Sequence, residues 1–488
     1  MAYSTISEFY TFLQQNQEGT AHDFQLKYVH KGKLKVIAKQ DFVQQVNSYL
    51  WNFIHVLRVK KGDFIVSLLA NNPNWMIVEW AILLCGGVHI PLRIEDGVQA
   101  LNDKLKRLEF SMVITDNDII EKKMEQELDS NSVRLINIKK LDFVRSKDLI
   151  HHSTLPEVGK DDRAVVLFTS GSSSSAKGII QTHENMLTAF QEFAQLDFMQ
   201  ESHVYLNLLH HSFSGGRKVC YAFLLNGKTI CFQSRSKNHF ENIELQRPDI
   251  IAVVPSMLIT LYPFLINLPT TSLQTIICGG SRLSSELFTQ YKELGIKVYS
   301  VYGLTETASI GAYNTSKSNK MAAVGKISRN LQYRISSEGE LLLKGPAVSK
   351  CCIADKQVVS ILDSEGFLHT GDLVDVDEDG FLFVRGRKSR VVKNSKGEFV
   401  DLEEIAEYLG AALGNHLCFV LEVDNSYKLA IGIHEPSQID GILNQKQLME
   451  KLRDEPLEGL VFFQAPKEMS VKIGVEKIYQ AKLKEIEW

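Results

Sequence analysis

The sequence predicts an α/β fold for the larger, N-terminal part of the chain. Short apolar stretches typical of strands alternate with stretches whose apolar residues recur at helical spacing, from residue 41 to about residue 301. After about Met321 the pattern changes to short strands separated by turns, which indicates a smaller β-rich subdomain. A chain of 488 residues is also too long for one simple core, so we expect two or three domains.

The first strand–helix–strand unit is predicted between residues 41 and 92. It comprises an amphipathic helix at 41–56, a strand at 64–69, a helix that opens at 71–73 and ends near Cys85, and an extended segment at 88–92. Gly86 and Gly87 follow the second helix, which is where glycines commonly close a helix.

The alternation continues along the chain. Strands are predicted at 111–115, 164–168, 250–254, 274–278 and 297–301, and helices at 256–266 and 284–294. Strands separated by helices form largely parallel sheets, and active sites in such folds lie at the C-terminal ends of the strands. The strands of the β-rich part are expected in KIS, YRIS, ELLLK, FLHTGD and GFLFV. From Arg387 the chain is first charged and then again alternates helix and strand.

Composition excludes several classes of protein. A net charge of -4 without a dense basic block argues against nucleic acid as a partner. The longest apolar stretch, residues 76–92, contains Glu79 and His89 and is short for a transmembrane segment, so none is expected. The N-terminus lacks the apolar core of a signal peptide. The seven scattered cysteines contain no C-x-x-C pair and are typical of reduced, mostly buried thiols, so a cytoplasmic location is expected.

Residues 167–180, LFTSGSSSSAKGII, form a loop of small residues with one lysine between two apolar runs. Backbone amides and hydroxyls in such a loop can wrap phosphates, and Lys177 adds a positive charge. On composition alone, a flexible Ser/Gly linker is the alternative. The loop is not a Walker motif, because no glycine precedes Lys177 and Gly178 follows it where Ser or Thr is required.

Further motifs follow this loop in a fixed order: THEN at 182–185, HHSF at 210–213, GGSRL at 279–283, YGLTET at 302–307, HTGDL at 369–373, and Gly386-Arg387. Together they resemble the adenylate-forming superfamily of acyl- and aryl-CoA ligases, luciferases and peptide-synthetase adenylation domains. The resemblance covers nearly the whole chain, including KKGDFIVSLLANNPNWMIVEWAILLCGGVHIPL near its start.

The resemblance implies an architecture and a reaction. Residues 1–386 would form a large N-terminal adenylation domain of two stacked α/β subdomains plus the β-rich subdomain, and residues 387–488 a small mobile α+β C-terminal domain. The implied enzyme is an acyl-CoA synthetase of fatty acid metabolism: ATP and a carboxylic acid give acyl-AMP and pyrophosphate, and a thiol then gives a thioester. ATP, Mg²⁺ and coenzyme A, or the phosphopantetheine of a carrier protein, are the expected cofactors and partners.

The resemblance also implies roles for individual residues, beginning with the nucleotide. Thr305 would contact the α-phosphate, Glu306 would hold Mg²⁺, and His211 would gate the carboxylate of the acid. The β- and γ-phosphates would be held by Thr169, Ser170, Gly171, Ser172, Ser173 and Lys177. The remaining nucleotide-binding residues would be Tyr302 and Gly303 beside adenine, Asp372 and Arg387 at the ribose, and Gly279, Gly280 and Ser281.

The C-terminal region would pivot between the two half-reactions about Ser389, and Lys393 and Gly397 would then line the thiol channel. The family also has a C-terminal lysine that contacts the acid and the α-phosphate during adenylation. Lys472 and Lys477 both fit that role, and Lys472 is favoured because Lys477 falls within a helical pattern.

Three hypotheses stay open from the sequence. In the first, the acceptor is coenzyme A. In the second, the acceptor is the phosphopantetheine of a carrier protein, or the acyl-AMP is released to a partner. A nucleotide-binding protein with degraded catalysis is the third, since Ser174 and Ala176 replace the usual glycine and proline and no glycine precedes the C-terminal lysine. The acid is expected to be aryl or medium to long acyl, unless Arg217 or Arg282 pairs with a second carboxylate.

Overall fold

The computed structural model describes residues 3–15, 23–30, 32–96, 98–127, 133–140, 155–169, 177–233, 241–268, 271–393, 399–402, 406, 418–423, 426–433 and 459–464. The chain divides into two compact units. The first comprises Met1–Arg334, Leu342–His369 and Val376–Phe383, and the second Ile335–Leu341, Thr370–Asp375 and Val384–Trp488.

An eight-stranded sheet in the order β19-β18-β8-β7-β4-β3-β5-β6 includes the two strands that flank the small-residue loop. Its strands are β3 Phe64–Leu68, β4 Val88–Pro91, β5 Met112–Thr115, β6 Arg134–Asn137, β7 Arg163–Phe168, β8 Gly178–Thr182, β18 Cys351–Ala354 and β19 Gln357–Ser360. Strands β6, β5, β3, β4 and β7 run parallel, because helices connect several of them, whereas β8, β18 and β19 add antiparallel at one edge.

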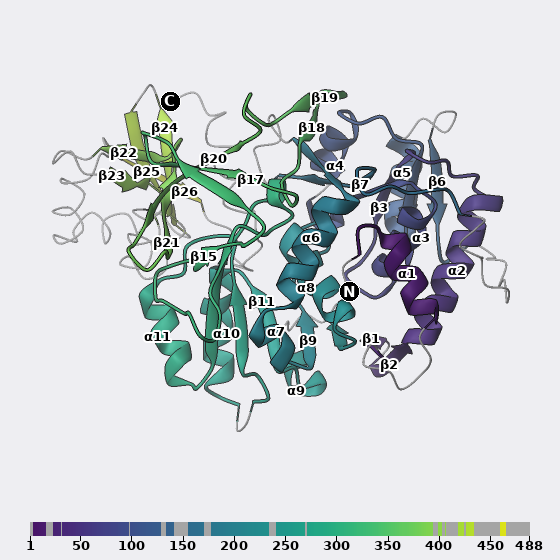
Figure 1. Cartoon of the computed structure of the whole chain (residues 1–488), viewed down its shortest axis with the longest axis horizontal. Helices are drawn as coiled ribbons and strands as arrows, with labels where there is room; N and C mark the ends of the chain where they lie inside the picture. Colours follow the sequence, from purple (N-terminus) through teal and green to yellow (C-terminus); the bar gives the residue numbers. More distant parts are fainter. Residues whose placement is uncertain are drawn as a thin grey trace. The chain divides into compact units, whose positions relative to one another are not determined.

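Helices α3 Asn74–Leu84, α4 Val98–Leu105 and α5 Asp118–Glu127 pack on this sheet, and the 3₁₀ helix η1 Ile94–Asp96 precedes α4. Helices α1 Ile6–Gln15 and α2 Lys39–His55 pack on α3. Helices α1, α2 and α3 lie side by side (Figure 1). Every residue of α3 from Trp75 to Leu84 is buried, which explains why its sequence is apolar on all faces.

A nine-stranded sheet in the order β15-β14-β13-β12-β11-β9-β10-β1-β2 contains the later motifs. Its strands are β1 Gln25–His30, β2 Lys33–Ala38, β9 Val204–Asn207, β10 Thr229–Phe232, β11 Ile250–Val253, β12 Thr275–Cys278, β13 Lys297–Tyr302, β14 Ala312–Tyr313 and β15 Lys326–Ile327. The run from β13 to β1 is parallel. Helices α9 Glu241–Gln246, α10 Pro255–Leu265 and α11 Ser285–Glu293 supply residues of the apolar cluster that packs on it.

Two central helices join the two sheets. Helix α6 His183–Ala194 packs on β8, helix α8 Ser214–Leu225 packs on β9 and β10, and the two helices pack on each other (Figure 1). Thr182 caps α6 through a reciprocal pair of hydrogen bonds with Asn185. The short helix α7 Asp197–Glu201 follows α6. The predicted stack of two α/β subdomains is therefore confirmed.

The rest of the described chain is rich in strands, as predicted. A four-stranded sheet in the order β16-β17-β20-β21 comprises Gln332–Ile335, Glu340–Lys344, Leu368–Val376 and Leu382–Arg387. Strands β22 Val391–Lys393 and β23 Phe399–Asp401 form a hairpin, and β24 Cys418–Val423, β25 Ser426–Ile433 and β26 Gly459–Gln464 form a mixed sheet. Within the described ranges, no helix is both long and apolar enough to span a bilayer. All seven cysteines are free thiols, and six of them are buried.

Glu79 and His89, which interrupt the longest apolar stretch, pair with each other in the core. Glu79 Oε2 lies 2.6 Å from His89 Nδ1, and His89 Nε2 lies 2.7 Å from Ser67 Oγ. Arg217 and Tyr221 of α8 donate to the same carboxylate. Burial raises the pKa of Glu79, but Arg217 and His89 outweigh burial and lower the pKa to about 2.

This network argues against the alternative in which Arg217 pairs with a second carboxylate of the substrate. The Arg217 side chain is fully buried and is bound to Glu79, so its charge is already compensated within the protein. A substrate carboxylate would have to displace a buried ion pair.

We predict that Glu79→Gln lowers the free energy of unfolding by about 3–5 kcal/mol, because it leaves the Arg217 guanidinium buried without an anionic partner. Urea denaturation monitored by circular dichroism measures this loss. Glu184→Gln is the matched control, since Glu184 pairs with Lys160 at 2.7 Å on the surface, where solvent screens the pair and its loss should cost far less. Equal effects of the two substitutions would contradict the prediction.

Candidate active site

Parallel strands of the nine-stranded sheet bring several predicted residues to one edge. His210 and His211 follow β9, Gly279 and Gly280 follow β12, and Gly303 follows β13. Because β9, β11, β12 and β13 are all parallel, their C-terminal ends share that edge. This is the position expected for a site in an α/β fold.

The small-residue loop connects two neighbouring strands of the eight-stranded sheet. Phe168 pairs with Gly178 in the β7–β8 ladder, and Thr169 N donates to Lys177 O at 3.1 Å. Residues 170–176 therefore connect two strands that pair within one sheet. Ser170, Gly171, Ser172 and Ser173, together with Ser174 and Ala176, lie outside the described residues.

Lys177 and Glu306, which are far apart in the sequence, both act on the thiol of Cys352. Burial raises the pKa of Cys352, the Lys177 ammonium lowers it, and the Glu306 carboxylate raises it. Cys352 lies opposite Ile179 in the β18–β8 pair, next to the end of the hairpin loop. The η3 segment, which contains Glu306, packs on β8, which begins directly after Lys177.

The YGLTET segment turns back sharply on itself. A Cβ atom at Gly303 would lie 2.4 Å from the carbonyl carbon of Ser309, so only glycine fits there. Leu304 O accepts from Thr307 N at 3.1 Å and from Ser309 N at 2.8 Å, which closes the short 3₁₀ helix η3, Thr305–Thr307. Both Thr305 and Glu306 are partly exposed.

Side chains and backbone from neighbouring elements hold this segment in place. Gln181 Nε2 of β8 donates to Thr305 O at 2.8 Å, and Ser349 N donates to Glu306 O at 2.7 Å. Asn185 Nδ2 donates to Pro346 O at 2.7 Å and to Val348 O at 3.1 Å, which orders the backbone leading to Ser349. Sequence reasoning missed Gln181, and its position directly before the THEN motif was the only signal.

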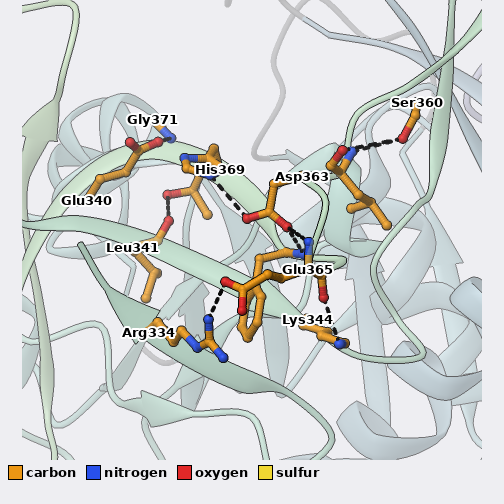
Figure 2. Close-up of polar contacts among 12 residues, drawn as sticks. Arg334, Glu340, Leu341, Lys344, Ser360, Asp363, Glu365, His369 and Gly371 are labelled. Atoms are coloured by element: carbon orange, nitrogen blue, oxygen red, sulfur yellow. Dashed lines mark hydrogen bonds and ion pairs between the residues drawn. The ribbon is translucent and has the colours of Figure 1, made fainter.

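The HTGDL motif is held in place by hydrogen bonds to strand β17. Thr370 Oγ1 donates to Leu341 O at 2.7 Å, and Gly371 N donates to Glu340 Oε1 at 2.9 Å (Figure 2). Gly371 has a φ of 72°, a conformation that favours glycine. The neighbouring His369 instead pairs with Asp363 at 3.4 Å, with half of its side chain exposed.

These contacts place Asp372 against Arg387. Asp372 is buried, and its Oδ1 lies 2.9 Å from Arg387 Nε. Arg387 Nη1 also donates to Thr370 O at 2.8 Å, while 46% of the Arg387 side chain stays exposed. The two residues predicted at the ribose are therefore neighbours, and a buried carboxylate held by a guanidinium is a ready acceptor for hydroxyl groups.

His211 is fully buried between aromatic rings. It stacks on Trp75 with centroids 4.9 Å apart and on His210 at 4.1 Å. Among the described residues neither of its ring nitrogens has a hydrogen-bond partner. Burial lowers the pKa of His211 well below its usual value, so the ring is neutral. Its role as a gate stays a prediction.

The remaining predicted residues fall in three settings. Gly280 has a φ of 91° in the turn after β12, and Ser281 beside it is exposed. Ser389 lies in the turn between β21 and β22, and Lys393 ends β22. Gly397, Lys472 and Lys477 lie outside the described residues.

Comparison with known proteins identifies the family. Residues 42–352 match the model of the AMP-binding enzyme family. Over 409 residues the chain is 25% identical to the peroxisomal OPC-8:0-CoA ligase 1 of Arabidopsis thaliana, covering 75% of this chain and 74% of the relative. It is 29% identical over 380 residues to 4-coumarate–CoA ligase-like 3 of the same plant, covering 70% and 67%.

Solved structures share the fold. The o-succinylbenzoate-CoA synthetase of Bacillus subtilis, in complex with its acyl-adenylate intermediate, superposes with a TM-score of 0.78 at 20% identity over 98% of both chains. A fatty acyl-CoA synthetase of Mycobacterium tuberculosis superposes with a TM-score of 0.72 at 18% identity, covering 98% of this chain and 99% of the other. The chain therefore belongs to the AMP-binding enzyme family, and it is an adenylate-forming enzyme of the AMP-forming acid–thiol ligase type.

Proposed function

We propose that this enzyme activates a carboxylic acid with ATP to an acyl-adenylate, releases pyrophosphate, and transfers the acyl group to the thiol of coenzyme A. The observation that carries the proposal is the packing of η3, which contains Thr305 and the Glu306 carboxylate, on β8, which begins directly after the cationic Lys177. A phosphate chain with its metal ion needs both kinds of group.

The proposed roles of the chain's residues follow from their chemistry. Attack of the acid's carboxylate on the α-phosphate builds negative charge on phosphate oxygens, so donors and cations matter more than a base. Thr305 would donate to the α-phosphate, and Lys177, with Thr169 and residues 170–173, would bind the β- and γ-phosphates. Tyr302 and Gly303, with residues 279–281, would border the adenine side. Asp372 and Arg387 would bind the ribose.

Glu306 fits the requirements of Mg²⁺. The described part of the chain contains no cluster of three or more His, Cys, Asp and Glu side chains that would form a metal site made of protein alone. Mg²⁺ in phosphoryl chemistry is instead held by one or two carboxylates together with phosphate oxygens, which a partly exposed Glu306 provides. Bound there, the ion would neutralise charge on the departing pyrophosphate.

The second half-reaction is proposed to use the C-terminal region. Residues 1–386 would form the adenylation domain, and residues 387–488 would pivot about Ser389, which lies in a turn that can absorb a change of backbone torsion. Lys393 and Gly397 would then border the thiol. A carrier-protein phosphopantetheine is the alternative acceptor.

The acid is proposed to be aryl or medium to long acyl. Its pocket would be lined from residues 211–217, 253–258, 278–283 and 301–310, which include the apolar Phe213, Met257 and Ile310. Relatives are named for 4-coumarate, ferulate and OPC-8:0. We propose the cytoplasm as the compartment, on the basis of seven free thiols. One relative is named peroxisomal, and fluorescence microscopy of the tagged chain distinguishes the two compartments.

We predict acid-dependent pyrophosphate release with a panel of hydroxycinnamic acids and fatty acids, and an acyl-CoA product when coenzyme A is present. Colorimetric pyrophosphate detection and mass spectrometry of the products measure the two steps. Acyl-AMP without any acyl-CoA would favour a carrier protein as acceptor. ATP binding without acid-dependent turnover across the panel would instead support degraded catalysis and reject the proposal.

We predict that Lys472→Ala abolishes adenylation but spares thioester formation from preformed acyl-AMP, because the lysine acts only while the α-phosphate is attacked. Each half-reaction is measured separately, by pyrophosphate exchange and by acyl-CoA formation from synthetic acyl-AMP. Lys477→Ala serves as the matched control and is expected to resemble the wild type. If the two variants exchange these behaviours, Lys477 is the catalytic lysine. If neither slows adenylation, the assignment of a C-terminal lysine is wrong.

We predict that Asp372→Ala removes the preference for ribose hydroxyls. The wild type should favour ATP over 2′,3′-dideoxy-ATP by at least about tenfold in kcat/KM, because a buried acceptor without its hydroxyl partner is penalised. The variant should discriminate by less than about twofold. Asp375→Ala is the control, since Asp375 lies on the same strand and pairs with Arg385 at the surface. Unchanged discrimination in Asp372→Ala would reject the ribose role.

A further inference from the structure

Two consecutive residues directly after the YGLTET motif have left-handed backbone conformations. Ala308 has a φ of 47° and Ser309 a φ of 64°, and neither is a glycine. Such conformations cost about 1 kcal/mol or more per residue because of the Cβ atom. They persist only where the surroundings hold them, and they cluster at functional sites. The contacts that stabilise this turn therefore also set the geometry of Thr305 and Glu306.

Lys218 of α8 contacts the turn directly. Its Nζ donates to Ser309 O at 2.5 Å and lies 3.9 Å from the ring centroid of Phe193 on α6. The residue is 2% exposed. One turn of α8 earlier, Gly215 faces the side chain of the same serine, since a Cβ there would lie 3.3 Å from Ser309 Oγ. Helix α8 thus holds the turn through an ammonium group and close packing.

A buried lysine is not the side chain that would stabilise the fold most, because burying its ammonium group costs desolvation free energy. Burial lowers the pKa of Lys218 to about 7, and the carboxylate of Glu192 partly opposes this effect. Glu192 is itself buried and accepts hydrogen bonds from Tyr313 OH at 2.7 Å and Ser328 Oγ at 2.8 Å, on the segment that follows the turn. An apolar side chain of similar size would avoid the desolvation of the ammonium. It would leave Ser309 O without this donor.

We infer that Lys218 is a positioning residue for adenylation: its ammonium holds the strained Ala308–Ser309 turn and thereby fixes Thr305 and Glu306 where the proposed function requires them. The inference rests on that proposed function for its effect on catalysis. It concerns a residue that contacts the protein backbone and is shielded from solvent. The contact with Ser309 O can be tested whether or not the enzyme turns over a given acid.

The first test is hydrogen–deuterium exchange of the full-length protein, with Lys218→Met compared with the wild type. The amides of Ala308, Ser309 and Ile310 are bonded within the turn, so peptides covering residues 303–312 should exchange at least about tenfold faster in the variant. Lys228→Met is the matched control, because Lys228 Nζ also donates to backbone carbonyls, those of Met199 at 2.7 Å and Gln200. It should leave residues 303–312 unchanged.

Unchanged exchange at residues 303–312 in folded Lys218→Met would overturn the inference. A uniform rise along the whole chain, without an excess in that segment, would overturn it equally, because it would indicate loss of global stability only. If Lys218→Met does not fold, Lys218→Leu also removes the N–H donor, with a shorter apolar side chain, and the same criteria apply to it.

The second test is acid-dependent pyrophosphate exchange with the most active acid of the panel. In Lys218→Met we expect kcat to fall at least about tenfold, because displacement of Thr305 and Glu306 from the positions in which they stabilise the transition state slows adenylation. KM for ATP should change by less than about threefold, since the loop and ribose contacts are intact. A wild type without exchange would reject the proposed function and leave the deuterium measurement decisive. An active wild type with unchanged kcat in the variant would reject the positioning role.

Discussion

The packing of α6 on α8 is the interaction on which the rest of the structure depends. Each helix rests on a different sheet, and between them Phe190 and Tyr221 stack with ring centroids 4.8 Å apart. This contact joins two sheets. The eight-stranded sheet contains the β7–β8 hairpin, and strand β13 of the nine-stranded sheet leads into the YGLTET segment. Without it, Lys177 and Glu306 would belong to separate layers. The candidate active site is therefore a consequence of how two subdomains stack.

The same interface contains buried charges, and these have different physical roles. Glu79 on α3 compensates Arg217 on α8, and the resulting network links α8 to the first sheet. Lys218, the next residue along α8, is directed to a backbone carbonyl instead of a carboxylate. Neighbouring residues of one helix thus stabilise the stack and hold a strained turn. Both contacts are desolvated, so each is costly to break once formed.

Secondary structure followed closely from the residues, because strands with apolar runs and helices with amphipathic spacing are local properties. The predicted strand at 164–168 is β7 Arg163–Phe168, and the predicted helix at 284–294 is α11 Ser285–Glu293. The position of the motifs at one edge of the sheet also followed from the sequence, because segments that come directly after parallel strands all lie at the C-terminal edge of the sheet. The pairing of Arg217 could not be predicted, because its partner Glu79 lies 138 positions away and nothing local to either residue indicates the pair.

The sequence by itself determined much of the order of the strands and helices and the family to which the chain belongs, and it indicated the residues that we propose bind the nucleotide. These depend on residue type and on spacing over a few positions. Only the tertiary structure decided that the Ser/Gly loop closes a hairpin, that Asp372 and Arg387 are partners, and that Lys218 holds the carbonyl of Ser309. Each of these is a contact between segments brought together by strand pairing or helix packing, and its geometry exists only when the layers have assembled.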